Sequence, residues 1–316
     1  MFSINEIEED LILLDKPSRI EMDKVIWINC SDKLVYECRE NQNVDLSFRI
    51  LPKNKQMLSN NLEYLYNHTN SKNGKELYSM YLSCINEWNS NIIADVYIEQ
   101  DGINVPDSQE PALIFTFRDS IKGWGYHNSF EYCKEANFVF MRNMLFRKLE
   151  KNGRCDGDDV LNKLYSVSEK FHLYQVGFFR RDGKDYLKCY LRFVPCDKIC
   201  EGVSEVFGDR AHMFFNYLQD EMLKYSQLCV LDFTWDLNEM KHLDKIGVSY
   251  DAIDTGEIRW NDEKRKKING IDVFLEKRYI SHYKVNIGGN GEREYKKYYE
   301  HLKRNMFYKN EEYLMH

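Results

Sequence analysis

Residues 174–193 read Tyr174-Gln-Val-Gly-Phe-Phe-Arg180, Arg181-Asp182-Gly183-Lys184-Asp185 and Tyr186-Leu-Lys-Cys-Tyr-Leu-Arg-Phe193. An Asp-Gly pair between two runs rich in aromatic residues predicts a β-hairpin with a tight turn. Because side chains alternate across a strand, the second run has two different faces. One face is apolar, with Leu187, Cys189, Leu191 and Phe193, and the other is polar, with Lys188, Tyr190 and Arg192.

The same order of elements recurs along the chain. Hairpins are predicted at 34–50, 94–118, 174–193, 228–250 and 281–299, with a glycine-rich turn at 287–291 in the last one. Helices are predicted between them at 56–68, 74–89, 129–150, 157–170, 197–206, 210–225 and 259–278. An antiparallel sheet of about ten strands tends to close, because closure removes exposed edges. We therefore predict an α+β fold: a ten-stranded antiparallel β-barrel of five α-β-β-α repeats with its helices outside.

Composition predicts one globular domain over residues 1–316. The chain is 43% hydrophobic and has five prolines and no Gly/Ser-rich linker. A net charge of -7 argues against nucleic acid as a partner. Residues 1–14 lack the pattern of a signal peptide, and no run of about 18 apolar residues occurs. The nine cysteines form no CxxC pair, so we expect reduced thiols in a cytoplasmic protein without a membrane partner.

The polar faces of the predicted strands share one feature, a long cationic side chain that usually lies near a tyrosine or serine. These cations are Arg49, Arg118, Lys188, Arg192, Lys245 and Lys284. Contact with water explains a polar face on any single strand. The amphipathic helices, however, must pack on the apolar faces, so the polar faces of a closed sheet turn inward. Cations that converge in a desolvated lumen repel one another unless an anion joins them, and a diphosphate is such an anion.

Short motifs in these strands resemble those of the soluble barrel-type (ABBA-fold) prenyltransferases, and most of all the cyanobactin-type peptide (RiPP) prenyltransferases. The resemblance spans roughly residues 25–305. Its motifs are Glu37 and Arg49 in VYECRENQNVDLSFRIL, Lys188 and Tyr190 in LKCYLRF, and Lys296 and Tyr298 in YKKYY. Either Lys296 and Tyr298, or the alternate residues of that strand from Arg293 to Tyr299, line the lumen.

The resemblance implies transfer of a prenyl group from an allylic diphosphate (dimethylallyl or geranyl diphosphate) to a side chain of a linear or macrocyclic peptide. Glu37, or alternatively Glu99, would take a proton from the acceptor. Fixed cations would neutralise the leaving diphosphate, and aromatic faces would shield the allylic cation. The candidate cations are Arg49, Arg118, Lys188, Arg192, Lys245, Lys284 and Lys296, and the candidate aromatic residues are Tyr97, Tyr190 and Tyr298.

No metal ligands are expected, because the sequence lacks a DDxxD pair, a Walker loop and an HExxH motif. Whether Mg²⁺ assists the diphosphate stays open. Three alternative functions also stay open: a non-catalytic peptide-binding maturation protein of the same fold, a prenyltransferase for small aromatic molecules, and another enzyme that handles phosphoesters.

Overall fold

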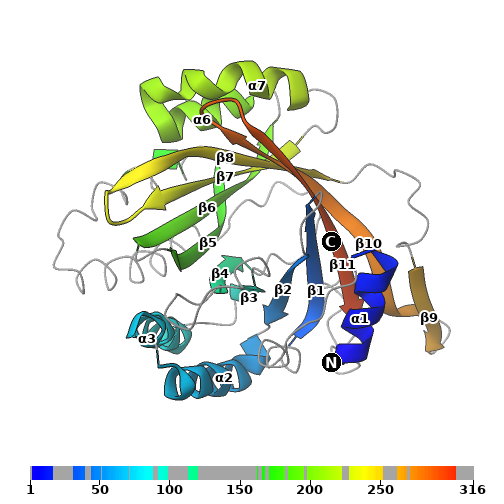
Figure 1. Cartoon of the computed structure of the whole chain (residues 1–316). Helices are drawn as coiled ribbons and strands as arrows, with labels where there is room; N and C mark the ends of the chain where they lie inside the picture. The colour runs from blue at the N-terminus through cyan, green and yellow to red at the C-terminus, as the bar shows by residue number, and fades with distance from the viewer. Residues whose placement is uncertain are drawn as a thin grey trace.

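The computed structural model describes residues 2–16, 31–39, 44–50, 52–70, 72–87, 92–98, 113–119, 162, 166–167, 171–181, 184–195, 198–222, 228–251, 262–268 and 271–303. Its main feature is a curled antiparallel sheet with helices packed outside it (Figure 1). The strands are β1 (Ser31–Arg39), β2 (Asp45–Ile50), β3 (Ile92–Ile98), β4 (Leu113–Asp119), β5 (His172–Arg181), β6 (Lys184–Pro195), β7 (Leu228–Asp236), β8 (Lys241–Asp251), β9 (Asp262–Ile268), β10 (Ile271–Gly288) and β11 (Arg293–Lys303).

Neighbouring strands pair in chain order from β1 to β8, and β8 then pairs with β10. Strand β11 pairs with β10 on one side and with β1 on the other, where Lys33 lies opposite Leu302 and Arg39 opposite Lys296. The hydrogen-bonded pairs therefore lead from β1 around the sheet and back to β1. Strand β9 pairs with the first part of β10, from Ile271 to Arg278, before β10 reaches β8.

The helices cover the apolar faces of the strands. They are α1 (Ile4–Leu13), α2 (Lys55–His68), α3 (Lys72–Glu87), α6 (Ile199–Phe207) and α7 (His212–Met222), with short 3₁₀ turns η2 (Pro52–Asn54) and η5 (Gly208–Ala211). Figure 1 shows α6 and α7 lying across β7 and β8. On these strands the side chains of Leu231, Phe233, Ile246 and Val248 are all at most 1% exposed. The strand alternation predicted from sequence thus buries its apolar side beneath the helices.

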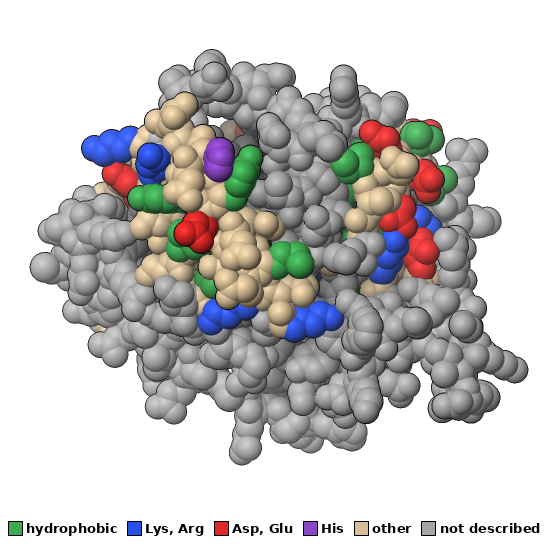
Figure 2. All heavy atoms as spheres, turned by 90° about the horizontal axis from the view of Figure 1, so that it is seen from below, with side chains coloured by type: hydrophobic (Ala, Val, Ile, Leu, Met, Phe, Trp, Pro, Cys, Tyr) green, Lys and Arg blue, Asp and Glu red, His purple; other side chains and the backbone are tan. Residues whose placement is uncertain are grey.

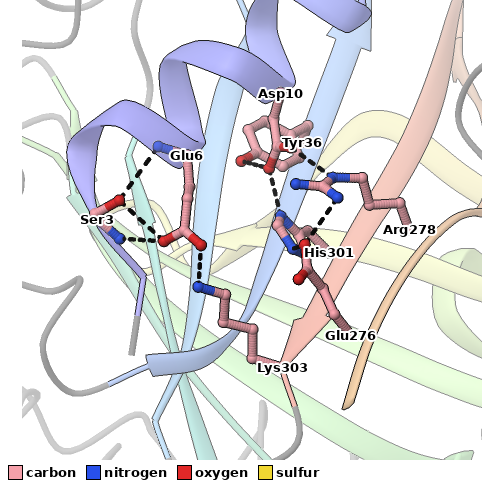
Figure 3. A network of polar contacts seen from close by, with 8 residues as sticks. All are labelled: Ser3, Glu6, Asp10, Tyr36, Glu276, Arg278, His301 and Lys303. Carbon is pink, nitrogen blue, oxygen red and sulfur yellow. Dashed lines mark hydrogen bonds and ion pairs between the residues drawn. The ribbon is translucent and has the colours of Figure 1, made fainter. Parts of the chain in front are cut away.

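Helix α1 lies beside β1, β10 and β11, the strands at which the sheet closes on itself (Figure 1). This helix was not predicted from the sequence. A capping box begins the helix, with Ser3 accepting from the Glu6 backbone N–H and Glu6 accepting from the Ser3 backbone N–H. Its Asp10 is fully buried and accepts hydrogen bonds from the hydroxyl of Tyr36 at 2.6 Å and Nε of Arg278 at 2.8 Å (Figure 3). Nδ1 of His301 lies 2.6 Å from the same carboxylate. These contacts join α1 to three strands.

The five predicted hairpins are confirmed at β1–β2, β3–β4, β5–β6, β7–β8 and β10–β11. In the last turn, Gly291 has a φ of 84°, and a Cβ there would lie 2.3 Å from the Tyr217 hydroxyl oxygen, so only glycine fits. The helices predicted at 56–68, 74–89, 197–206 and 210–225 correspond to α2, α3, α6 and α7. Those at 129–150 and, apart from three residues, 157–170 lie outside the described residues.

The helix predicted at 259–278 is wrong, because β9 occupies residues 262–268 and the first part of β10 occupies residues 271–278. Its many Glu, Lys and Arg residues favour a helix in isolation. Residues 276–278 of β10, however, pair with β9 on one side and with β11 on the other, and such long-range pairing overrides local propensity. The repeat of helices and hairpins is therefore interrupted after β8.

Among the helices that the structure describes, none combines the length and apolar character needed to cross a bilayer. On the face shown in Figure 2, the described acidic and basic side chains are interspersed instead of being separated by sign. The cysteines in the described segments, Cys38, Cys189, Cys200 and Cys229, are free thiols.

Candidate functional site

Polar and charged side chains gather on the inner face, which we define as the face of the sheet opposite the one covered by α1, α6 and α7. Its described members are Lys33, Glu37, Arg39, Asp45, Arg49, Lys188, Tyr190, Asp232, Tyr279, His282, Lys284, Asn286, Glu294, Lys296, Tyr298 and Glu300. Several of them are less than 10% exposed, which requires that their charges be compensated within the protein. The inner face is therefore a buried electrostatic site.

One carboxylate on β7 lies between two lysines. Asp232 is 3% exposed, and its Oδ2 lies 2.5 Å from Nζ of Lys284 while its Oδ1 lies 3.3 Å from Nζ of Lys188. The ring of Tyr190 lies beside both ammonium groups, with its centroid 5.2 Å from Lys188 and 5.7 Å from Lys284. This is cation–π distance. We call Lys188, Asp232 and Lys284 the Asp232 triad; it combines one carboxylate with two lysine amines.

Gly247 makes room for the triad. It lies opposite Asp232 on β7 and opposite Asn286 on β10. A Cβ at this position would stand 2.2 Å from Oδ2 of Asp232 and 2.5 Å from Cε of Lys284. Contacts that short do not occur, so a side chain here would separate the two groups or move them. The glycine is explained by this close approach of side chains to the backbone.

Charge competition within the triad shifts the pKa values of its members. Burial lowers the pKa of Lys284 to about 7, because desolvation and repulsion from Lys188 and Lys296 outweigh the attraction of Asp232. Burial works to raise the pKa of Asp232, but the two triad lysines hold that pKa below its ordinary value. Asp232 is therefore ionised at neutral pH, while Lys284 can gain or lose its proton there.

A second group surrounds Glu37 on β1. This carboxylate is 5% exposed, and it accepts from Nζ of Lys296 at 2.5 Å and from the hydroxyl of Tyr298 at 2.5 Å. Arg39 donates to it from Nη2 at 2.8 Å. Burial works to raise the pKa of Glu37, but Lys296 and Arg39 hold that pKa well below its usual range. Glu37 is thus a firmly held carboxylate ion.

Arg39 connects this group to two further carboxylates. Its Nη2 lies 2.7 Å from Asp45, which is fully buried, and its Nε lies 3.2 Å from Glu294. Glu294 also accepts from the side-chain amide of Asn286 at 2.7 Å. Sequence reasoning assigned no role to Arg39, although its position two residues after Glu37 places both on one strand face.

A third group lies further along the same strands. Glu300 pairs with Lys33 and accepts from the hydroxyl of Tyr279. Burial works to raise its pKa, but Lys33 and Arg49 lower that pKa to about 2. The ring of His282 stacks on Tyr298 with centroids 4.1 Å apart. Burial lowers the pKa of His282 to about 4 against the pull of Glu300, so its imidazole is neutral at pH 7.

The structure brings together most of the predicted residues that it describes. Those on the inner face are Glu37, Arg49, Lys188, Tyr190, Lys284, Lys296 and Tyr298. Of the two possible faces of the last strand, the one with Lys296 and Tyr298 lies on the inner face, because both side chains contact Glu37. Tyr295, on the other face, is 49% exposed. Lys245 contacts Glu294 at 3.5 Å, but its side chain is 54% exposed, so it lies at the margin of the site.

For four predicted residues, the structure does not describe the side chain, so it does not place them in the site. The structure describes Tyr97, Arg118 and Arg192 by their backbone pairing alone, opposite Ser47, Gln175 and His172 respectively. Glu99 lies outside the described residues. The roles of these four stay predictions.

The main feature that sequence reasoning missed is the set of carboxylates. Cations were expected to converge and to need an external anion, yet Asp232, Glu294 and Glu300 already pair with Lys284, Arg39 and Lys33 respectively. The alternation of β7 and β11 could have placed these acids on the polar face. Their partners could not be found in this way, since they come from strands far apart in sequence. Within the described part of the chain, no group of three or more His, Cys, Asp or Glu side chains is arranged to hold a metal ion.

Comparison with known proteins gives weak similarities. No family model and no curated protein matches the sequence. The 6-dimethylallyltryptophan synthase from Micromonospora olivasterospora, in complex with DMASPP and Trp, is 11% identical over 87% of this chain and 83% of its own, with a TM-score of 0.45. AnaPT from Neosartorya fischeri is 11% identical over 87% of this chain and 79% of its own, with a TM-score of 0.47. Prenyltransferase PriB in its apo form is 7% identical over 86% of this chain and 79% of its own, with a TM-score of 0.45.

Such identities and TM-scores assign neither a family nor an activity to this chain. A function must therefore be argued from the residues of the inner face.

Proposed function

We propose that this chain is a cytoplasmic prenyltransferase that transfers a prenyl group from an allylic diphosphate to a side chain of a peptide. In this proposal one domain forms a closed ten-stranded barrel, and the inner face lines its lumen. The pairing of β11 with both β10 and β1 supports the closed form. The observation that carries the function is the Asp232 triad, a buried group with excess positive charge beside a tyrosine ring.

The balance of charge favours the triad as the place for the diphosphate. Around Glu37, the carboxylates of Asp45 and Glu294 share the cations Arg39 and Lys296, so negative charge offsets positive charge. In the triad one carboxylate, Asp232, forms ion pairs with two lysines. An anion added there gains attraction without meeting an excess of negative charge. Fixed cations at this position would also stabilise the charge that develops as the allylic C–O bond breaks.

Aromatic rings and a carboxylate adjoin this place. The ring of Tyr190 lies beside both triad lysines, and Tyr298, whose ring stacks on His282, is close enough to Asp232 and Tyr190 to interact with them electrostatically. Both rings are proposed to shield the allylic cation. Glu37 accepts from Tyr298 and is the proposed base, with Glu99 as the alternative. Its low pKa makes it a weak base as it stands. Contact with Lys296 would have to loosen when the acceptor binds, so that the carboxylate can take the proton.

The peptide acceptor is proposed on the sequence resemblance alone. Arg49, Arg118, Arg192, Lys245 and Lys296 are proposed as further cations of the lumen, and Tyr97 as a further shielding ring. Mg²⁺ is not required by the proposal, since the triad lysines supply positive charge.

Mass spectrometry tests the proposal directly. The protein is incubated with dimethylallyl or geranyl diphosphate and with peptides rich in Trp, Tyr or Arg, and free tryptophan serves as the small aromatic acceptor. Addition of one prenyl unit to a peptide is the expected result. Modification of tryptophan alone would select the small-molecule enzyme, and phosphate release without transfer would select a different phosphoester chemistry. If no donor gives a mass gain and no phosphate is released, the remaining alternative is the non-catalytic peptide-binding protein.

The donor site is tested by substitution. Lys188→Ala should weaken binding of a thiolodiphosphate analogue by about 1.5–3 kcal/mol, the scale of a hydrogen bond to a charged group. Lys241→Ala is the matched control, because this lysine lies on β8 with its side chain 59% exposed. Titration calorimetry measures both. Equal affinity in the two variants would remove Lys188 from the site.

A further inference from the structure

The carboxylates of the inner face differ in how firmly they are held. Glu37 accepts from Lys296, Tyr298 and Arg39, and Glu300 accepts from Lys33 and Tyr279. Asp232 is different, because each of its two oxygens forms an ion pair with one lysine of the triad, and Oδ2 has no hydrogen-bond partner among the described residues. Moving Asp232 away therefore breaks contacts that another anion at the same place would restore.

The backbone beside Asp232 carries no side chain that holds its carboxylate in place. Oδ2 of Asp232 occupies the position where a side chain at residue 247 would begin, and Gly247 has none. The carboxylate thus rests on bare backbone, with no side chain from β8 to hold it at that point. Its position is set by attraction to Lys188 and Lys284.

We propose that Asp232 is an internal counter-ion that occupies the diphosphate site while the site is empty, and that the incoming diphosphate displaces it from Lys188 and Lys284. This inference rests on the proposed function and concerns the regulation of the same site. Without a counter-ion the two buried lysines would repel each other, and Lys284 would lose its proton more readily. With Asp232 present the empty site is stable, and the donor must compete with the carboxylate for both lysines. Asp232 therefore keeps donor affinity below what the lysines alone would give.

Calorimetric titration with inorganic pyrophosphate compares wild type with Asp232→Asn, which keeps the shape and removes the charge. We expect Asp232→Asn to bind pyrophosphate more tightly by roughly 5- to 150-fold, which is the size of a typical coupling free energy between a ligand and a second interacting group. Its melting temperature should fall without ligand and should rise more steeply than that of wild type when pyrophosphate is added. Asp236→Asn is the matched control, since Asp236 is also a buried carboxylate of β7 but pairs with Lys184 at the end of the strand. Its affinity for pyrophosphate should stay near that of wild type.

The outcomes separate this inference from the proposed function. Tighter binding in Asp232→Asn alone supports the inference. If wild type binds pyrophosphate and Asp232→Asn binds it equally or more weakly, the inference is wrong and the proposed function stands. Binding by Asp232→Asn but not by wild type supports the counter-ion and contradicts the proposed function. Absence of binding in both overturns both.

A crystal structure of wild type with dimethylallyl thiolodiphosphate provides a test that needs no variant. The diphosphate oxygens should then contact Lys188 and Lys284, and the carboxylate of Asp232 should have left at least one of them. A diphosphate bound elsewhere, with both contacts of Asp232 intact, would overturn the inference even if the enzyme is active.

Discussion

The contacts of Asp10 predict a large loss of stability when this side chain is removed. Asp10→Ala deletes a fully buried carboxylate that Tyr36, Arg278 and His301 all contact. Breaking a buried ion pair costs about 3–5 kcal/mol when the remaining charge has no partner. Here Arg278 keeps Glu276 at 2.8 Å. We therefore expect a loss near the lower end of that range, about 3 kcal/mol.

Urea unfolding followed by tryptophan fluorescence measures this loss, and the slope with denaturant should stay the same if the fold is kept. Glu6→Gln is the control on the same helix. Glu6 caps the helix and pairs with Lys303 near the surface, so its loss should cost about 1 kcal/mol. Tyr36→Phe combined with Asp10→Ala should be non-additive, because the two side chains form one hydrogen bond. Equal losses for Asp10→Ala and Glu6→Gln would refute the role given to the buried network.

Two further predictions concern the inner face. Glu37→Gln should reduce prenyl transfer, measured by mass spectrometry, by roughly 10²–10⁴-fold while leaving pyrophosphate affinity close to that of wild type; a larger effect of Glu99→Gln would reverse the assignment of the base. The second concerns pH. Because the pKa of Lys284 is about 7, the fraction of this lysine that is protonated falls above that pH, and a diphosphate must restore the proton as it binds. Calorimetry from about pH 7 to about pH 9 should therefore show affinity falling more steeply in wild type than in Lys284→Arg, whose guanidinium stays charged. Parallel profiles would contradict the shifted pKa.

Local patterns were sufficient to predict the strands and their faces. The alternation of Leu187, Cys189 and Leu191 with Lys188 and Tyr190 is a property of one segment, and it determines which side is buried whatever the strand pairs with. The same reasoning failed over residues 259–278, where composition favours a helix but the pairing partners lie in β9 and β11.

The contacts of the site could not be predicted, because they depend on register. Asp232 reaches Lys284 because it lies opposite Gly247, which in turn lies opposite Asn286. A slip of one residue between any two of these strands would turn one partner to the other face. Likewise, Lys296 belongs to the inner face because Tyr298, two residues later, lies opposite Glu37 on β1. A single sequence contains the residues of these pairs but not their alignment.

The pairing of β1 with β11 also determines when the protein can finish folding. Lys33 lies opposite Leu302, so β1 must wait for its partner until β11 has been synthesised. Helix α1 waits as well, since Arg278 and His301 are the partners of its Asp10. Until β11 is made, β1 keeps an open edge that invites pairing with other chains. We expect closure to be a slow step that follows the synthesis of β11, because contacts of such long sequence separation form slowly. A circular permutant in which β11 directly precedes α1 and β1 should therefore fold during synthesis with less aggregation.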